Sequence, residues 1–83
     1  NIYTVYPNPA KNIVCIELIN KENKPEKGTK ISAKLFDLMA QTKTLVPITE
    51  NKATFSVESL IKGVYVLNIY INDKVETHQI IVE

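Results

Sequence analysis

Apolar and polar residues alternate along most of this 83-residue chain, and this period of two constrains the fold more than any other feature. Successive side chains of a β-strand point to opposite faces, so the alternation predicts half-buried strands and not amphipathic helices. β-Branched residues dominate the apolar runs, and Pro, Gly, Asn and Asp separate them at intervals of about ten residues. We expect strands at residues 2–6, 12–19, 30–37, 41–46, 53–57, 64–71 and 75–82.

Seven short strands without a helix-length pattern between them predict an all-β fold, a small antiparallel Ig-like β-sandwich. The length suits one domain, residues 1–83, because a chain of this size builds a single core. One Cys and no Trp are present, so the Cys…Trp…Cys framework of true immunoglobulin domains is absent and the likeness is architectural only. The core should come from alternate positions of four strands. Strand by strand, these positions are Val14, Ile16, Leu18; Ile31, Ala33, Leu35; Phe55, Val57; and Tyr65, Leu67, Ile69, Ile71.

The charge and hydropathy of the chain exclude several classes of partner. The formal net charge is only +1, and all ten basic residues are Lys. Without Arg, the chain lacks the planar donor fork that reads phosphates and guanine edges, so we predict no nucleic-acid partner. No apolar run approaches the roughly 20 residues that span a bilayer, so we predict no direct membrane insertion.

Groups that could serve catalysis or metal binding are few. His78 is the only histidine and is expected at the surface or on an edge strand, while Cys15 is expected to be a small buried apolar residue. Neither has a nucleophile, base or metal ligand at a useful spacing. Asp37 should hydrogen-bond the backbone of the turn that follows it. Gly28 and Gly63 are too few for a phosphate-binding loop, so we predict no enzyme and no catalytic, cofactor or metal site.

Stiff and sharply turning residues stand at the junctions between strands. Near the start, "VYPNPAKN" places two prolines around Asn8, and each proline fixes φ and favours extended backbone before it. Later, "FSVESLIKGVYVLNI" makes a compact corner, in which Leu60 should plug the core and Gly63 should permit a sharp exit. Tyr65 should then lock the strongest strand into the core, with its hydroxyl at the rim.

Taken in order, these motifs resemble the type A C-terminal sorting domains of the type IX secretion system, also called the Por secretion system, over nearly the whole chain. Phe36 and Asp37 fit the aromatic-Asp pair of that family, but Ala40 stands where glycine is usual, and Ala is costly at positive φ. No Lys or Arg follows Lys74, although a basic residue is common near the end of such domains. The motif positions and those implied in recognition are Tyr6, Pro7, Asn8, Pro9, Asp37, Leu60, Gly63, Tyr65, Gln79, Ile80, Ile81, Val82 and Glu83.

The resemblance implies a secretion signal carried in a folded domain, which is a substrate of export and not a catalyst. We expect the chain to be a fragment from the C-terminal end of a larger secreted protein, because Asn1 is not an initiator Met. The implied partners are the outer-membrane type IX machinery and a sortase-like cysteine peptidase, which cuts ahead of Asn1 and can join the cargo to the surface. The cargo would be in the periplasm during transit and then secreted or at the cell surface.

The last strand is the segment that we expect the machinery to read. An unpaired terminal strand, Thr77 to Glu83, would offer backbone donors and acceptors for β-augmentation by a partner. Exposed edge strands would also permit a weak homodimer.

Two other functions stay open from the sequence. A carbohydrate-binding module would need a coplanar patch of exposed aromatic rings, for which the chain offers Tyr3, Tyr6, Tyr70 and Phe36. A spacer or adhesion domain of the fibronectin type III kind would bind no ligand and would recur within its parent protein.

Overall fold

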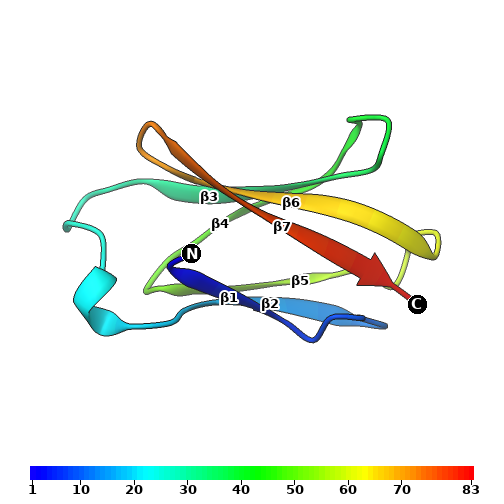
Figure 1. The fold of residues 1–83 in the computed structure, drawn as a ribbon, viewed down its shortest axis with the longest axis horizontal. Helices are drawn as coiled ribbons and strands as arrows, with labels where there is room; N and C mark the ends of the chain where they lie inside the picture. Colours follow the sequence, from blue (N-terminus) through cyan, green and yellow to red (C-terminus); the bar gives the residue numbers. More distant parts are fainter.

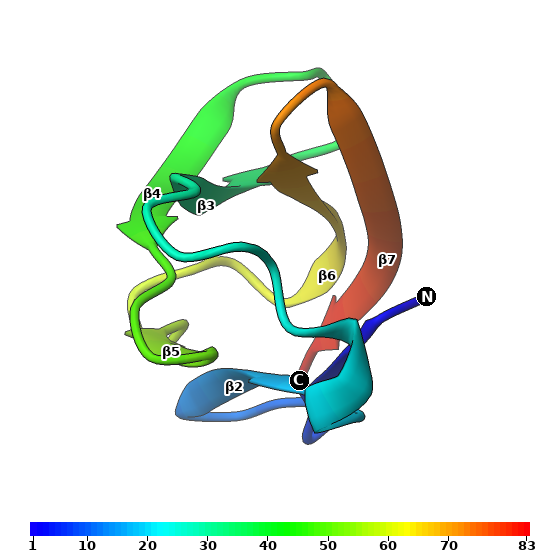
Figure 2. The ribbon, with the colours of Figure 1, turned by 90° about the vertical axis from the view of Figure 1, so that its left-hand side faces the viewer.

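The computed structural model describes residues 1–83 and consists of two antiparallel β-sheets packed face to face (Figures 1 and 2). The three-stranded sheet has the order β1-β2-β5, and the four-stranded sheet has the order β4-β3-β6-β7. The predicted all-β sandwich of seven strands is therefore confirmed. The strands are β1 (Tyr3–Tyr6), β2 (Ile13–Leu18), β3 (Ile31–Phe36), β4 (Thr42–Pro47), β5 (Lys52–Ser56), β6 (Gly63–Ile71) and β7 (Lys74–Val82).

Each observed strand begins and ends within one residue of its predicted bounds. The polar connection between β2 and β3 holds one element that the sequence pattern did not predict, a single-turn 3-10 helix η1 (Lys21–Asn23). Asn20 caps it, because its side-chain oxygen accepts a hydrogen bond from the Glu22 N–H at 3.0 Å. Figure 2 shows this connection passing from one sheet layer to the other.

The core lies between the two sheets and contains most of the residues predicted from the alternation. Leu18, Ile31 and Ile71 are exceptions, since they are only partly buried against its margin. Each lies at the end of its strand, where Ile31 pairs with Ile71 and Leu18 pairs with Tyr3. The buried apolar residues are Tyr3, Ala10, Val14, Ile16, Ala33, Leu35, Ile48, Phe55, Val57, Tyr65, Leu67, Ile69, Ile80 and Val82.

Two residues lie elsewhere than predicted. Cys15 does not join the core but is half-buried on the outer face of the three-stranded sheet, where it pairs with Tyr6 on one side and Thr54 on the other. Tyr3, expected among the exposed aromatic rings, is only 1% exposed and belongs to the core. Burial raises the pKa of its hydroxyl, and the charge of Glu76 raises it further.

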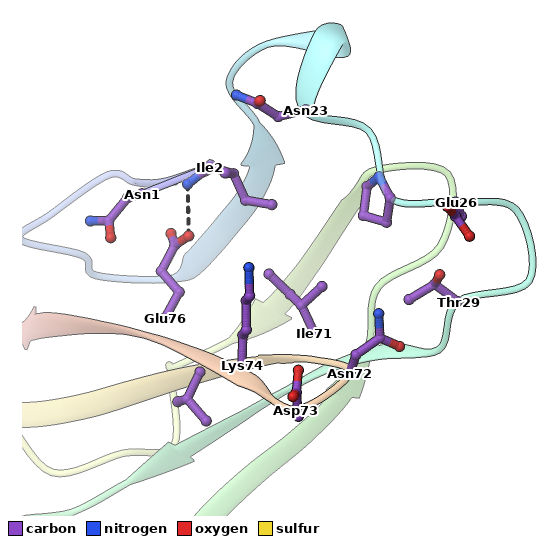
Figure 3. A pocket seen from close by; sticks show the side chains of 12 residues that line it. Asn1, Ile2, Asn23, Glu26, Thr29, Ile71, Asn72, Asp73, Lys74 and Glu76 are labelled. Atoms are coloured by element: carbon purple, nitrogen blue, oxygen red, sulfur yellow. Dashed lines mark hydrogen bonds between the residues drawn. The ribbon is translucent and has the colours of Figure 1, made fainter.

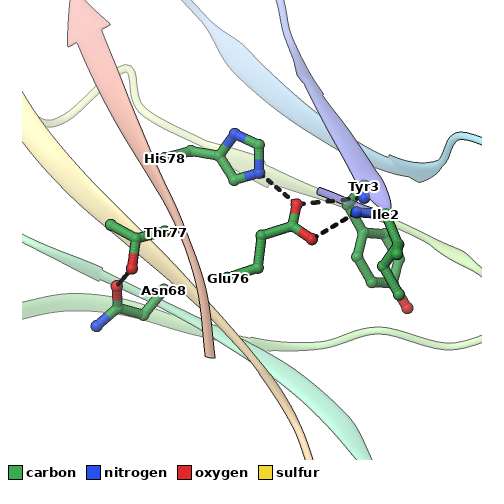
Figure 4. Close-up of polar contacts among 6 residues, drawn as sticks. All are labelled: Ile2, Tyr3, Asn68, Glu76, Thr77 and His78. Atoms are coloured by element: carbon green, nitrogen blue, oxygen red, sulfur yellow. Dashed lines mark hydrogen bonds and ion pairs between the residues drawn. The ribbon is translucent and has the colours of Figure 1, made fainter. Parts of the chain in front are cut away.

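A buried carboxylate joins the edge strands of the two sheets (Figure 4). Glu76 on β7 accepts hydrogen bonds from the Ile2 N–H at 2.7 Å and from the Tyr3 N–H at 3.2 Å. The ring of His78 turns inward beside it, with Nε2 at 2.6 Å from Glu76 Oε2. His78 thus lies on an edge strand as predicted, but its side chain is only 17% exposed and is engaged with Glu76.

Replacing the charge of this carboxylate should weaken the sandwich. In Glu76→Gln the amide keeps one oxygen acceptor, but its NH₂ group faces backbone donors, so we expect a loss of about 1–3 kcal/mol in the free energy of unfolding. Urea denaturation measures this change in the free energy of unfolding. The matched control is Glu26→Gln, on an exposed loop residue, which should change stability by less than about 0.5 kcal/mol. Equal stability of the two variants would contradict a bridging role for Glu76.

Candidate functional site

Four separate parts of the chain that carry the sequence motifs meet at one end of the sandwich (Figure 1). They are the turn after β1, the β3–β4 turn, the β5–β6 corner and the last residues of β7. We call this region the motif end and define it as residues 7–10, 37–41, 58–63 and 79–83. The β6–β7 turn and the connection that carries η1 lie at the opposite end.

The outer edge of the terminal strand is covered at the motif end. The Asn8 side chain acts like a piece of backbone, because its Nδ2 donates to the Gln79 C=O at 2.7 Å and its Oδ1 accepts from the Ile81 N–H at 2.9 Å. Ala10 continues the pairing in parallel, donating to the Ile81 C=O at 2.8 Å and accepting from the Glu83 N–H at 2.9 Å. The expectation of an unpaired terminal strand is therefore wrong for most of residues 79–83, because the Gln79 C=O, the Ile81 N–H and C=O and the Glu83 N–H all have partners within the domain.

Side chains of the terminal strand divide between the core and the solvent. Ile80 and Val82 are 0% and 3% exposed and complete the core. Gln79, Ile81 and Glu83 point to the solvent, with Ile81 41% exposed. The resemblance implied all five terminal residues in recognition. Two of them therefore belong to the core, and the other three are accessible to a partner.

The segment before Asn8 is fixed to the neighbouring strand. The Tyr6 hydroxyl donates to Glu17 Oε1 at 2.7 Å across the β1–β2 pair. This hydrogen bond is the main reason why the pKa of Tyr6 rises to about 12, since losing the proton would lose the bond. Pro7 and Pro9 follow with exposed rings, and the peptide bond before each is cis.

Asp37 organises the β3–β4 turn, as predicted. Its Oδ1 accepts hydrogen bonds from the N–H groups of Met39 and Gln41, both at 2.9 Å. These bonds favour the carboxylate and lower the pKa of Asp37, the Gln41 bond most strongly, and Lys43 adds to the effect. Ala40 has φ 63°, so the position where the resembled domains carry glycine does adopt the left-handed conformation.

The β5–β6 corner is closed by a tyrosine. Leu60 packs partly buried against the core, which agrees with its predicted role as a plug. Gly63 has φ 154°, a backbone conformation that residues with side chains rarely adopt. The Tyr65 ring is buried and its hydroxyl donates to the Ile61 C=O, an arrangement like the tyrosine corner of Ig-like domains.

Other groups that could form a site are not brought together. Cys15 lies on an outer face and His78 turns inward, so they form no nucleophile–base pair. No group of three or more His, Cys, Asp or Glu side chains could hold a metal ion. No helix of the structure is long and apolar enough to cross a membrane.

The largest hollow, of about 600 Å³, lies away from the motif end between η1, the β6–β7 turn and the start of β1 (Figure 3). Only three of its twelve lining residues are hydrophobic, and none belongs to the sequence motifs. Its most buried acidic group, Glu76, already accepts backbone hydrogen bonds.

The aromatic rings do not form a shared face for carbohydrate. Tyr3 is in the core and the Tyr6 hydroxyl is bound to Glu17 on the three-stranded sheet. Phe36 and Tyr70 lie partly buried on β3 and β6 of the other sheet. A coplanar platform of these four rings is therefore not formed, and the carbohydrate-binding alternative loses the feature on which it depended.

The fold is a small Ig-like β-sandwich whose sequence motifs gather at one end. The family model described as the secretion system C-terminal sorting domain matches residues 4–83, and the chain belongs to this family. No curated protein matches the chain. The resemblance stated from the motifs is thereby confirmed: this is a sorting domain of type IX secretion, which implies interaction with the secretion machinery and a secreted or cell-surface parent protein.

Removing the Asn8 side chain should open the covered edge of β7. Asn8→Ala loses two hydrogen bonds to the strand, so we expect about 1–2 kcal/mol less stability and faster hydrogen exchange at the Ile81 amide. Asn12→Ala is the control, because the Asn12 side chain is exposed and makes no hydrogen bond. Unchanged exchange at Ile81 would show that Asn8 does not protect this edge.

Restoring glycine in the β3–β4 turn should stabilise the domain. A left-handed conformation costs a non-glycine residue about 1–2 kcal/mol, and the extra flexibility of unfolded glycine offsets part of the gain. We therefore expect Ala40→Gly to raise the free energy of unfolding by up to about 1 kcal/mol, measured by denaturation. Ala53→Gly, within β5, should instead lower it, and a loss of stability in both variants would refute the turn argument.

Proposed function

We propose that this domain is the folded export signal of a secreted cargo, read at its motif end by the outer-membrane type IX machinery. The observation that carries the proposal is the meeting of four motif segments at one end of the sandwich, in a chain that belongs to the sorting-domain family. Because the segments are far apart in sequence, the machinery meets them together only in a folded domain.

Only part of the motif set is free to contact a partner. Leu60, Tyr65, Ile80 and Val82 contribute to the core, and the oxygens of Asp37 hold its turn. The accessible motif residues are Tyr6, Pro7, Asn8, Pro9, Gln79, Ile81 and Glu83. We infer that recognition uses these side chains on the fixed surface that Asn8 and Ala10 make with β7, and not free backbone at residues 79–83.

The finer steps after recognition belong to the same proposal. A sortase-like cysteine peptidase cuts in the chain ahead of Asn1 and joins the cargo to the cell surface. Asn1 lies away from the motif end of a molecule that is 36 Å along its longest axis, so receptor and peptidase can approach different regions (Figure 1). Edge strands β4 and β5 remain available for the weak homodimer that we expect from unpaired edges.

The test is a fusion that carries an inner-membrane signal peptide, a fluorescent protein and residues 1–83, expressed in a bacterium with type IX secretion. We expect fluorescence in the medium or on the cell surface, and periplasmic retention of the same fusion without the domain. A shorter exported product, lacking the domain, would support the peptidase step. Retention of a fusion whose domain is folded would overturn the proposed function.

A truncation that removes residues 79–83 is a poor test of recognition. It takes Ile80 and Val82 out of the core, so failed export would report lost folding as readily as lost contact. The substitution Ile81→Gln keeps the core intact while changing an exposed side chain. Substitutions of this kind separate the two causes.

A further inference from the structure

Three large apolar side chains at the motif end are more exposed than any others on the molecule. Leu38 and Met39, in the β3–β4 turn, are 71% and 82% exposed, and Ile61, in the β5–β6 corner, is 83% exposed. Removing apolar surface from water is favourable, so a partner that covered these side chains would gain binding free energy from their burial. We call Leu38, Met39 and Ile61 the apolar tip.

The backbone beneath the apolar tip is fixed. The Asp37 carboxylate accepts from the Met39 N–H, and the Asp37 C=O accepts from the Ala40 N–H at 3.1 Å. On the other side, the Ile61 C=O accepts the hydroxyl hydrogen of the buried Tyr65. The two turns therefore present their apolar side chains in a set position, which lowers the ordering cost of binding.

A hollow of about 400 Å³ lies between the two turns. Six of its eleven lining residues are hydrophobic, including all three of the apolar tip. A hollow of this size takes a few side chains and not a whole sheet face. It suits a short segment of a partner and the small contact area of a transient complex.

One positive charge at this hollow has no partner within the domain. Three charged residues line it, and two of them, Asp37 and Lys43, form an ion pair at 3.7 Å. The third, Lys62, makes no ion pair. A bound segment that carries a carboxylate beside its apolar side chains would complement both features of the hollow.

We propose that the apolar tip and Lys62 form a docking site for a short apolar segment with an acidic side chain, contributed by a protein of the outer-membrane secretion machinery. The proposal rests on the proposed function and identifies the chemistry of the partner. The site adds residues that no motif position includes, since Leu38, Met39, Ile61 and Lys62 all lie outside the motif set. It also lies at the same end of the sandwich as the terminal strand (Figure 1).

The test uses the export fusion with Leu38→Gln, Met39→Gln and Ile61→Gln combined. All three side chains are exposed, so the midpoint of urea denaturation should not change, while export should fall about tenfold or more. The matched control combines Ile19→Gln, Leu45→Gln and Val75→Gln, which are 59%, 62% and 54% exposed away from the apolar tip. This control should be exported like the parent fusion.

A second pair of variants tests the charge. Lys62→Glu should reduce export and Lys62→Arg should preserve it, because only the first reverses the sign. Normal export of Lys62→Glu would overturn the acidic part of the proposal, and normal export of the triple Gln variant would overturn the docking site. If the parent fusion itself is retained, the proposed function fails and the docking site fails with it.

Sedimentation of the isolated fusion tests whether the apolar tip is instead covered by a second copy of this chain. A parent fusion that dimerises, with a triple Gln variant that stays monomeric, would assign the apolar tip to a second copy of this chain and overturn the machinery as its partner. A monomer in both cases supports the proposal when it accompanies the export defect.

Discussion

The pairing of β7 with residues near the start of the chain determines both the stability and the surface of this domain. On one side β7 forms a long antiparallel ladder with β6, and on the other it is held by Asn8 and Ala10 near its end and by Glu76 near its beginning. An edge strand normally leaves a row of unpaired donors and acceptors. Here Asn8 and Ala10, in the prolyl turn, satisfy the last part of that row, and the buried Glu76 carboxylate binds the backbone N–H groups of Ile2 and Tyr3 in the other sheet.

This arrangement divides the motif residues into those that hold the fold together and those whose side chains are accessible to a partner. Asn8 does both, because its amide pairs with β7 while the residue remains exposed between two prolines. Tyr65 and Asp37 act through other residues: each fixes a turn whose side chains then face the solvent. Asp37 and Tyr65 are therefore positioning residues, and the contact that we propose with a partner falls to their neighbours in the turns.

Much of the fold could be predicted from the sequence because the alternation is long and the turns are marked by Pro, Gly, Asn and Asp. Those local patterns set strand bounds, but they do not say which distant segment pairs with an edge. The bonds from Asn8 to Gln79 and Ile81 join residues roughly 70 positions apart along the chain, and no local period reports them. The first half of β7 could not be predicted for a similar reason. From their polarity, Glu76 and His78 would be expected to face the solvent, but both side chains point inward. Glu76 accepts hydrogen bonds from the N–H groups of Ile2 and Tyr3, and His78 contacts Glu76. The family motifs marked the turns and the terminal strand but did not predict that these meet at one end of the sandwich. The nearness of Leu38 and Met39 to Ile61 likewise becomes visible only in the structure.

The covering of β7 by the first residues of the domain also bears on how cargo is made. Residues 8–10 find their partners only after residues 79–83 exist, and Ile80 and Val82 complete the core at the same moment. A chain that ends before residue 79 lacks these partners of the prolyl turn and two residues of the core. Because the export signal that we propose is a folded shape, products interrupted before residue 79 should lack it.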